Sequence, residues 1–301
     1  MAKWAEFLGA RRTLVVLLAL FFFPGCTHVF YQPDKALHYP PEKFGYKPVL
    51  HRFTSRDDTK LVAWFFPSKR AKPLGTVVQF HGNAQNISSH YLSLVWLTEM
   101  GFNLFTFDYR GYGLSAGSAT PEGVYDDSVA ALDLAYQLHE SSVKKAGLKK
   151  SKFVIVGQSL GGAIAMRAHA DFSHRSATNL IVLESTFSSY RSVARKALSS
   201  HWLTWAFSPL ASLLVSDEYA SIEALKNNAT RLLVIHDRRD PAVPHSEGLK
   251  IFEEATGPKT FWETDYGTHI DFFSPHHAGN REKFIQFLNK AENDKSKQHL
   301  G

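Results

Sequence analysis

The segment FVIVGQSLGGA, residues 153–163, joins a short apolar run to a run of small residues through Gly-Gln-Ser-Leu-Gly. Four apolar residues predict a buried strand, and the small residues after Gly162 predict a closely packed helix. Between them lies the pattern G-x-S-x-G, with Ser159 at its centre. Such a turn exposes a serine in a strained conformation, and glycines beside it avoid clashes. The segment predicts a nucleophilic Ser159, against the plainer interpretation of a glycine-rich turn with an incidental serine.

Strands and helices are expected to alternate along most of the chain. Besides 153–156, short apolar runs predict strands at 49–53, 61–66, 76–80, 102–107, 180–183, 232–235 and 260–262. Helical spacing of apolar residues predicts helices at 88–100, 121–140, 163–170 and 282–290. This alternation is typical of an α/β fold whose mostly parallel sheet is flanked by helices on both faces.

One domain accounts for most of the 301 residues, and their composition is 44% hydrophobic and 21% charged, which excludes a disordered chain. We expect this domain at 48–290, after a linker at 27–47 and before a polar tail at 291–301. Residues 187–228 interrupt the alternation of strands and helices. They contain Trp202 and Trp205 but no apolar run that predicts a strand. They predict a small helical cap inserted between two strands.

The net charge of +6 does not identify a nucleic-acid-binding protein. Basic residues are spread along the chain, and neither a zinc-finger spacing nor an RNA-binding signature is present. No nucleic-acid partner is therefore expected.

The N-terminus, residues 1–26, has the features of an export signal. Lys3, Arg11 and Arg12 precede the apolar run 13–23, which is short for a membrane span, and Cys26 follows as the one cysteine of the chain. The arrangement resembles a bacterial lipoprotein signal, which implies lipidation of Cys26. The alternative is an uncleaved signal anchor. Both predict an exported, membrane-anchored protein, periplasmic or on the outer membrane if the source is bacterial.

A nucleophilic serine needs a base, and the base needs an acid that orients it. Asp240 follows the predicted strand 232–235 and is the expected acid, with Asp237 as its competitor. His269 lies in a glycine-containing loop after the last predicted strand and is the expected base. His276 and His277 are the alternatives, although no strand precedes them directly.

An oxyanion hole needs two N–H donors. The backbone N–H of Leu160, next after the nucleophile, is the expected first donor. The second is expected from the loop after strand 76–80, where Asn83 is the first choice and Ala84 the near alternative.

Five motifs in the expected order resemble the α/β-hydrolase superfamily, in particular its membrane-anchored, serine-aminopeptidase-like branch. They are His-Gly-Asn-Ala at 81–84, Asp-Tyr-Arg-Gly-Tyr-Gly-Leu-Ser at 108–115, Gly-Gln-Ser-Leu-Gly-Gly at 157–162, Asp-Pro-Ala-Val-Pro at 240–244 and Gly-Thr-His at 267–269. The resemblance covers about residues 47–290 and implies an α/β-hydrolase fold.

The resemblance and the site residues together imply a serine hydrolase that forms an acyl-enzyme on small-molecule or lipid esters near a membrane. Thioesterase, protein deacylase and peptidase activities are alternatives within the same fold. A non-catalytic, membrane-tethered binding module is the alternative from another class. Neither a cofactor nor a metal is implied, and the sequence does not specify the oligomeric state.

Overall fold

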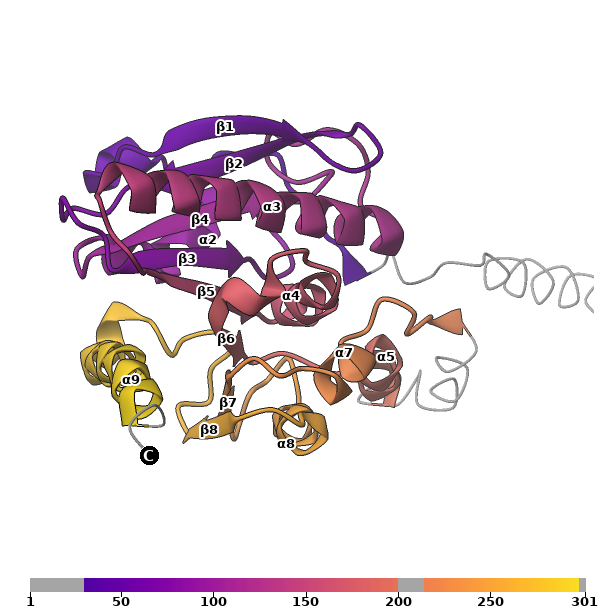
Figure 1. Ribbon diagram of the computed structural model, residues 1–301. Helices are drawn as coiled ribbons and strands as arrows, with labels where there is room; N and C mark the ends of the chain where they lie inside the picture. The colour runs from indigo at the N-terminus through magenta and orange to yellow at the C-terminus, as the bar shows by residue number, and fades with distance from the viewer. Residues whose placement is uncertain (1–29, 200–213, 298–301) are drawn as a thin grey trace, which may run out of the picture.

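A central sheet of eight strands organises the computed structural model, which describes residues 30–199 and 214–297. The strand order is β1-β2-β4-β3-β5-β6-β7-β8. β1 and β2 are antiparallel to their neighbours, whereas every pair from β4 to β8 is parallel. Figure 1 shows helices covering this twisted sheet, which confirms the predicted α/β fold.

The strands extend the apolar runs of the sequence by one or a few residues. Their bounds are β1 Val49–Thr54, β2 Lys60–Phe66, β3 Gly75–Phe80, β4 Phe102–Asp108, β5 Lys152–Gln158, β6 Thr178–Glu184, β7 Leu232–Asp237 and β8 Lys259–Thr264.

Alternate residues of the strands supply two hydrophobic cores, one on each face of the sheet. One core joins residues such as Val78 and Phe105 to helices α3 Pro121–Lys145, α4 Leu160–Ala170, α7 Ile222–Lys226 and α8 His245–Glu254. The other joins residues such as Val77 and Leu104 to helices α2 Ile87–His90 and α9 Ala278–Lys297. Because both faces are covered, the central strands are buried along their whole length.

The predicted helix at 88–100 is wrong in part. The segment holds only the short α2, followed by the 3-10 turns Tyr91–Ser93 and Val95–Thr98. The carbonyl of His90 accepts hydrogen bonds from Gln79 Nε2 at 2.9 Å and from Ser93 Oγ at 2.9 Å. An α-helix needs that carbonyl for the N–H of Leu94, which donates to Tyr91 O instead. A buried side chain of β3 thus replaces the helical hydrogen bond.

Structure extends beyond both bounds of the predicted domain, 48–290. Residues 30–47 lie against the domain, where Tyr31 is buried, and α9 continues through most of the predicted polar tail to Lys297. Between β6 and β7 the structure has α5 Tyr190–Ser199 and α7, while Trp202, Trp205 and the predicted signal with Cys26 lie outside the described residues. Within the described ranges no helix is long and apolar enough to cross a membrane.

The topology predicts the place of a ligand-binding crevice, at the carboxyl end of the sheet between β3 and β5. The chain leaves β3 for β4 on one side and returns to β5 on the other. Ligands of open α/β sheets bind where the strand order reverses in this way. The loop after β3 and the turn after β5 both lie at this point.

Candidate active site

Ser159 lies at the tip of the turn between β5 and α4, with φ 52° and ψ −122°. Its glycine neighbours are required by close packing. A Cβ on Gly157 would lie 2.5 Å from the Cα of Gly162, and a Cβ on Gly161 would lie 2.2 Å from the carbonyl oxygen of Phe80. The same closeness brings the N-terminus of α4 against the end of β3.

Strained backbone is concentrated around this turn. Six non-glycine residues of the described chain have positive φ, and five of them flank the crevice. Ala84 and Gln85 follow β3, Ser159 follows β5, Ser185 follows β6 and Ile270 follows His269. Left-handed conformations of such residues cost about 1–3 kcal/mol each and cluster at functional sites. This signal points to the same place as the sequence motifs.

Three side chains from distant parts of the chain form a continuous hydrogen-bonded series. Ser159 Oγ lies 2.9 Å from His269 Nε2, and His269 Nδ1 lies 2.8 and 3.0 Å from the two carboxylate oxygens of Asp240. The Asp240 side chain is fully buried, while that of His269 is 20% exposed. The structure therefore brings together the predicted nucleophile, base and acid in the geometry of a catalytic triad.

The charge of Asp240 fixes the roles of the two histidine nitrogens. Burial opposes ionisation of Asp240, but His269 and the N–H groups of Val243 and Ala242 outweigh it and lower the pKa of the carboxyl. An ionised carboxylate can only accept hydrogen bonds, so Nδ1 of His269 carries the proton. In a neutral imidazole Nε2 is then an acceptor, and Ser159 Oγ donates to it.

Asp237, the competing acid, has a different task. Its carboxylate accepts hydrogen bonds from the N–H groups of Tyr266, Gly267 and Arg239 and from Thr264 Oγ1. These donors outweigh burial and lower the pKa of Asp237. Asp237 thus fixes the loop that carries His269 without touching the imidazole in any hydrogen bond.

His276 and His277, the alternative bases, do not take part in the hydrogen-bonded series of Ser159. His277 pairs with Asp271 at 3.1 Å and stacks on Tyr266 with the ring centroids 3.8 Å apart. His276 is exposed at the surface. Neither has a hydrogen bond to Ser159 within the described chain.

The loop after β3, residues 81–86, is called the oxyanion loop. The N–H of Ala84 donates to Asn83 Oδ1 at 2.8 Å, so this alternative donor is occupied. The N–H groups of Asn83 and Leu160 have no acceptor among the described residues. Leu160 is also the first residue of α4, where the helix dipole favours negative charge. These two groups are open to a substrate oxyanion.

A buried polar series joins β3 to the ends of β5 and β6, and the sequence did not predict the roles of its members Gln79 and Gln158. Gln79 Nε2 donates to Gln158 Oε1 at 2.9 Å, and Gln158 Nε2 donates to Glu184 Oε2 at 2.7 Å. The other carboxylate oxygen, Oε1, accepts from Phe272 N at 2.8 Å. Glu184 thus connects the serine turn to the histidine loop. The one signal in the sequence is a carboxylate that directly ends a buried strand.

We expect Glu184→Gln to remove a pH-dependent contribution to stability. Burial raises the pKa of Glu184 from its ordinary 4.5 to about 7, against the hydrogen bonds from Gln158 and Phe272. The folded state therefore holds a proton between pH 4.5 and 7 that the unfolded chain releases, and the free energy of unfolding falls across this window by up to about 3 kcal/mol. Urea unfolding at pH 5 and pH 7.5 measures the change. An equal change in wild type and variant contradicts this assignment.

The Asp108–Ser115 motif also supports the loops beside the site. Asp108 Oδ1 accepts from Ile87 N at 2.9 Å, and a Cβ on Gly113 would lie 1.9 Å from Asp108 Oδ2. Arg110 forms ion pairs with Asp127 and Asp57. These residues hold structure around the crevice rather than the reacting atoms.

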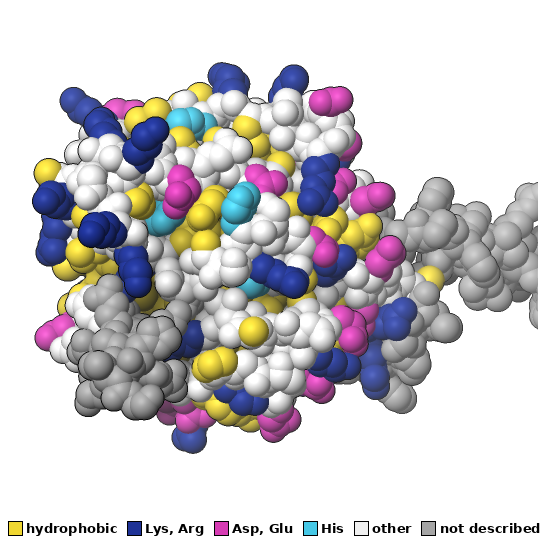
Figure 2. Space-filling view, in the orientation of Figure 1, with side chains coloured by type: hydrophobic (Ala, Val, Ile, Leu, Met, Phe, Trp, Pro, Cys, Tyr) yellow, Lys and Arg dark blue, Asp and Glu magenta, His cyan; other side chains and the backbone are white. Residues whose placement is uncertain are grey.

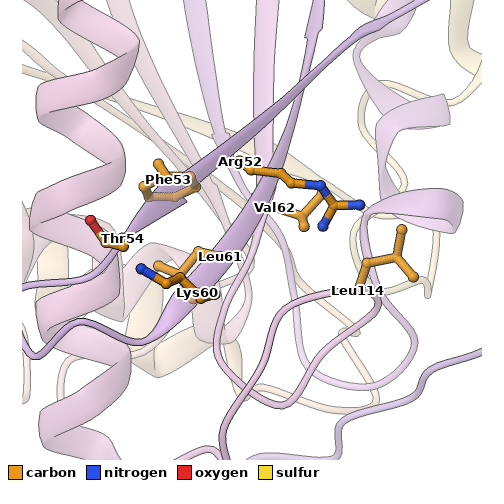
Figure 3. A pocket seen from close by; sticks show the side chains of 7 residues that line it. All are labelled: Arg52, Phe53, Thr54, Lys60, Leu61, Val62 and Leu114. Atoms are coloured by element: carbon orange, nitrogen blue, oxygen red, sulfur yellow. The ribbon is translucent and has the colours of Figure 1, made fainter.

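Other surface features do not offer a competing site. A shallow pocket of about 420 Å³ lies over β1 and β2, where Figure 3 shows Arg52, Lys60 and Leu114 among its lining side chains. Its lining residues include no His, Ser, Cys, Asp or Glu. In Figure 2 basic and acidic side chains are interspersed over the visible face, without a large patch of one sign. No group of three His, Cys, Asp or Glu side chains in the described ranges is arranged to hold a metal ion.

Comparison with known proteins agrees with this geometry. The family described as serine aminopeptidase, S33, matches residues 71–237, which include the oxyanion loop, the serine turn and Asp237. The chain belongs to the serine aminopeptidase S33 family. It is also 31% identical to the protein YfhR of Escherichia coli O157:H7 over 298 residues, covering 94% of this chain and 97% of that protein.

Two solved structures have a fold similar to that of this chain, although their sequences are less than 25% identical to it. The Pyrococcus furiosus esterase Pf2001 has a TM-score of 0.68 at 18% identity, with 87% of this chain and 98% of that chain covered. The Pyrococcus horikoshii acylaminoacyl peptidase has a TM-score of 0.62 at 17% identity, with 81% and 41% covered. The family match and the fold together show that the chain is a serine hydrolase of the α/β-hydrolase fold.

Proposed function

We propose that the chain is a carboxylesterase that cleaves acyl or lipid-like esters through an acyl-enzyme on Ser159. The series Ser159–His269–Asp240 carries this proposal, because each link lies within hydrogen-bond distance. Ser159 Oγ attacks the ester carbonyl while His269 Nε2 takes its proton, and the N–H groups of Leu160 and Asn83 bind the oxyanion. His269 then protonates the leaving alkoxide. A water activated by the same histidine releases the acid.

The carboxylates around the site favour an ester over a peptide with a free amino terminus. An aminopeptidase has to bind the substrate's ammonium group, which a carboxylate free of other partners does best. Here Glu184 and Asp237 accept backbone N–H groups, Asp271 pairs with His277, and Glu247 accepts from Ser188 and Ser192. Residues 200–213 contain no Asp or Glu. An uncharged acyl group fits these surroundings better.

Substrate preference tests this proposal. We expect kcat/KM for p-nitrophenyl esters, from acetate to dodecanoate, to exceed that for alanine and leucine p-nitroanilides by at least about 100-fold, because Glu184, Asp237, Asp271 and Glu247 all have other partners and none is free to bind the ammonium group. The esters release p-nitrophenolate and the anilides release p-nitroaniline, and each product is measured by its absorbance with its own extinction coefficient. Faster cleavage of the aminoacyl anilides contradicts the ester proposal and favours an aminopeptidase.

We further propose that the enzyme works at a membrane. The support is the basic and apolar segment before Cys26 in the sequence. Phe30, which follows this segment, packs its ring on Tyr190 of α5 with the centroids 5.4 Å apart.

Lipidation of Cys26 is expected to provide the anchor. Wild-type protein expressed with an alkyne fatty acid in a bacterial host should carry the label, and Cys26→Ala should carry none because the thiol that accepts the lipid is missing. Cys26→Ser is the conservative control and should behave like the alanine variant. Membrane-bound but unlabelled wild type contradicts lipidation and favours the uncleaved anchor.

A further inference from the structure

Residues 30–39, called the strap, lie across the oxyanion loop. This segment precedes the region matched by the family, which begins at residue 71. Its N–H groups at His38 and Tyr39 donate to the side chain and carbonyl of Ser88, at 2.9 and 3.2 Å. Gln32 N donates to Asn83 Oδ1 at 2.8 Å and to Tyr112 Oη at 3.0 Å. The strap therefore contacts the oxyanion loop at Asn83 and the start of α2, directly after the loop, at Ser88.

Asn86 is the strongest link between the two segments. Its side-chain amide donates to the carbonyls of Asp34 at 3.0 Å and Ala36 at 2.7 Å. Its Oδ1 accepts from the N–H and hydroxyl of Ser88, at 2.9 and 2.6 Å. Asn86 is only 2% exposed, so these hydrogen bonds are shielded from water.

The loop between Asn83 and Asn86 needs such support. Ala84 and Gln85 have φ of 58° and 55°, two consecutive left-handed residues without glycine. Surrounding contacts have to hold a conformation of this kind. Asn83 is tied at one side through Gln32 and Tyr112, and Asn86 is tied at the other through the strap.

We propose that Asn86 is a positioning residue that clamps the strap onto the oxyanion loop and thereby holds the N–H of Asn83 in place. The inference rests on the proposed esterase function. Residues 30–39 then support the oxyanion hole from outside the region that the family matches. Displacement of the strap is expected to weaken transition-state stabilisation rather than substrate binding.

Asn86→Asp tests the clamp while keeping the helix cap. Aspartate retains the acceptor for Ser88 but places an oxygen against the carbonyls of Asp34 and Ala36. We expect kcat for a p-nitrophenyl ester to fall about 10- to 100-fold with KM changed less than about threefold, because a misplaced oxyanion donor acts in the transition state. Tyr112→Phe, which removes one tie of Asn83 with little change in packing, should lower kcat in the same direction by a smaller factor.

Asn103→Asp is the matched control, because Asn103 is also buried and its side-chain amide donates to Thr76 Oγ1 and Ser142 Oγ, near the start of β4 and not in the oxyanion loop. Its kcat should stay within about twofold of wild type. Amide hydrogen exchange provides a readout that needs no turnover: residues 82–86 should exchange faster in Asn86→Asp and Tyr112→Phe than in Asn103→Asp.

The outcomes separate the clamp from the proposed function. Folded variants with wild-type kcat and unchanged exchange at 82–86 overturn the clamp and leave the esterase intact. A folded wild type without turnover overturns the esterase, and hydrogen exchange then decides the clamp alone. If Asn86→Asp does not fold, the kcat and exchange of Tyr112→Phe decide.

Discussion

Ser159→Ala is expected to lower kcat/KM for a p-nitrophenyl ester by about 10⁴-fold or more. The substitution removes the attacking oxygen but keeps the Cβ, so the turn with φ 52° is retained. Steady-state kinetics measures the loss, and circular dichroism checks that the variant is folded.

Ser185→Ala is the matched control for Ser159→Ala. Ser185 is also a buried serine with positive φ, 49°, beside the same crevice, but its hydroxyl has no hydrogen bond to the triad. Its kcat/KM should remain within about threefold of wild type. An equal loss in both variants indicates that packing of the crevice, rather than the nucleophile, limits activity.

Asp240→Asn is expected to lower kcat/KM by about 10³- to 10⁴-fold. The amide no longer stabilises the imidazolium that forms when His269 takes the proton, and it no longer selects the tautomer with hydrogen on Nδ1. The hydrogen bonds from Ala242 and Val243 to Asp240 Oδ1 can persist, so the loop should keep its conformation.

Asp237→Asn provides the comparison that separates the two carboxylates. Its four donors shape the histidine loop, so the variant should melt at a lower temperature and lose about tenfold or less in kcat/KM. A larger loss of activity in Asp237→Asn than in Asp240→Asn contradicts the assignment of Asp240 as the acid.

The sequence predicted the parts of the fold that depend on local patterns. Apolar runs located the strands because their side chains fill the two cores, and G-x-S-x-G located the turn because Gly161 meets the backbone of Phe80. Ser159, Asp240 and His269, which the structure brings together, could be selected from the sequence because each follows a strand at the carboxyl edge of the sheet.

Features that depend on contacts between distant residues could not be predicted in the same way. The two aspartates lie three residues apart in one loop, and only the folded chain shows that Asp240 reaches His269 while Asp237 binds backbone N–H groups. The interrupted helix after β3 depends on Gln79, and the strap depends on Asn86. Each of these features depends on a single polar side chain, which leaves no periodic pattern in the sequence from which it could be predicted.

Labelling with a fluorophosphonate, followed by peptide mass spectrometry, tests the central claim most directly. The probe reacts with a serine that is activated by a base. An oxyanion hole stabilises the negative charge that develops on the probe's P=O oxygen during this reaction. We predict one adduct, on Ser159, in the folded wild-type protein, with labelling lost in Ser159→Ala and strongly slowed in His269→Ala. A folded wild type that is not labelled, or an adduct that persists in Ser159→Ala, would contradict the assignment of Ser159 as the nucleophile.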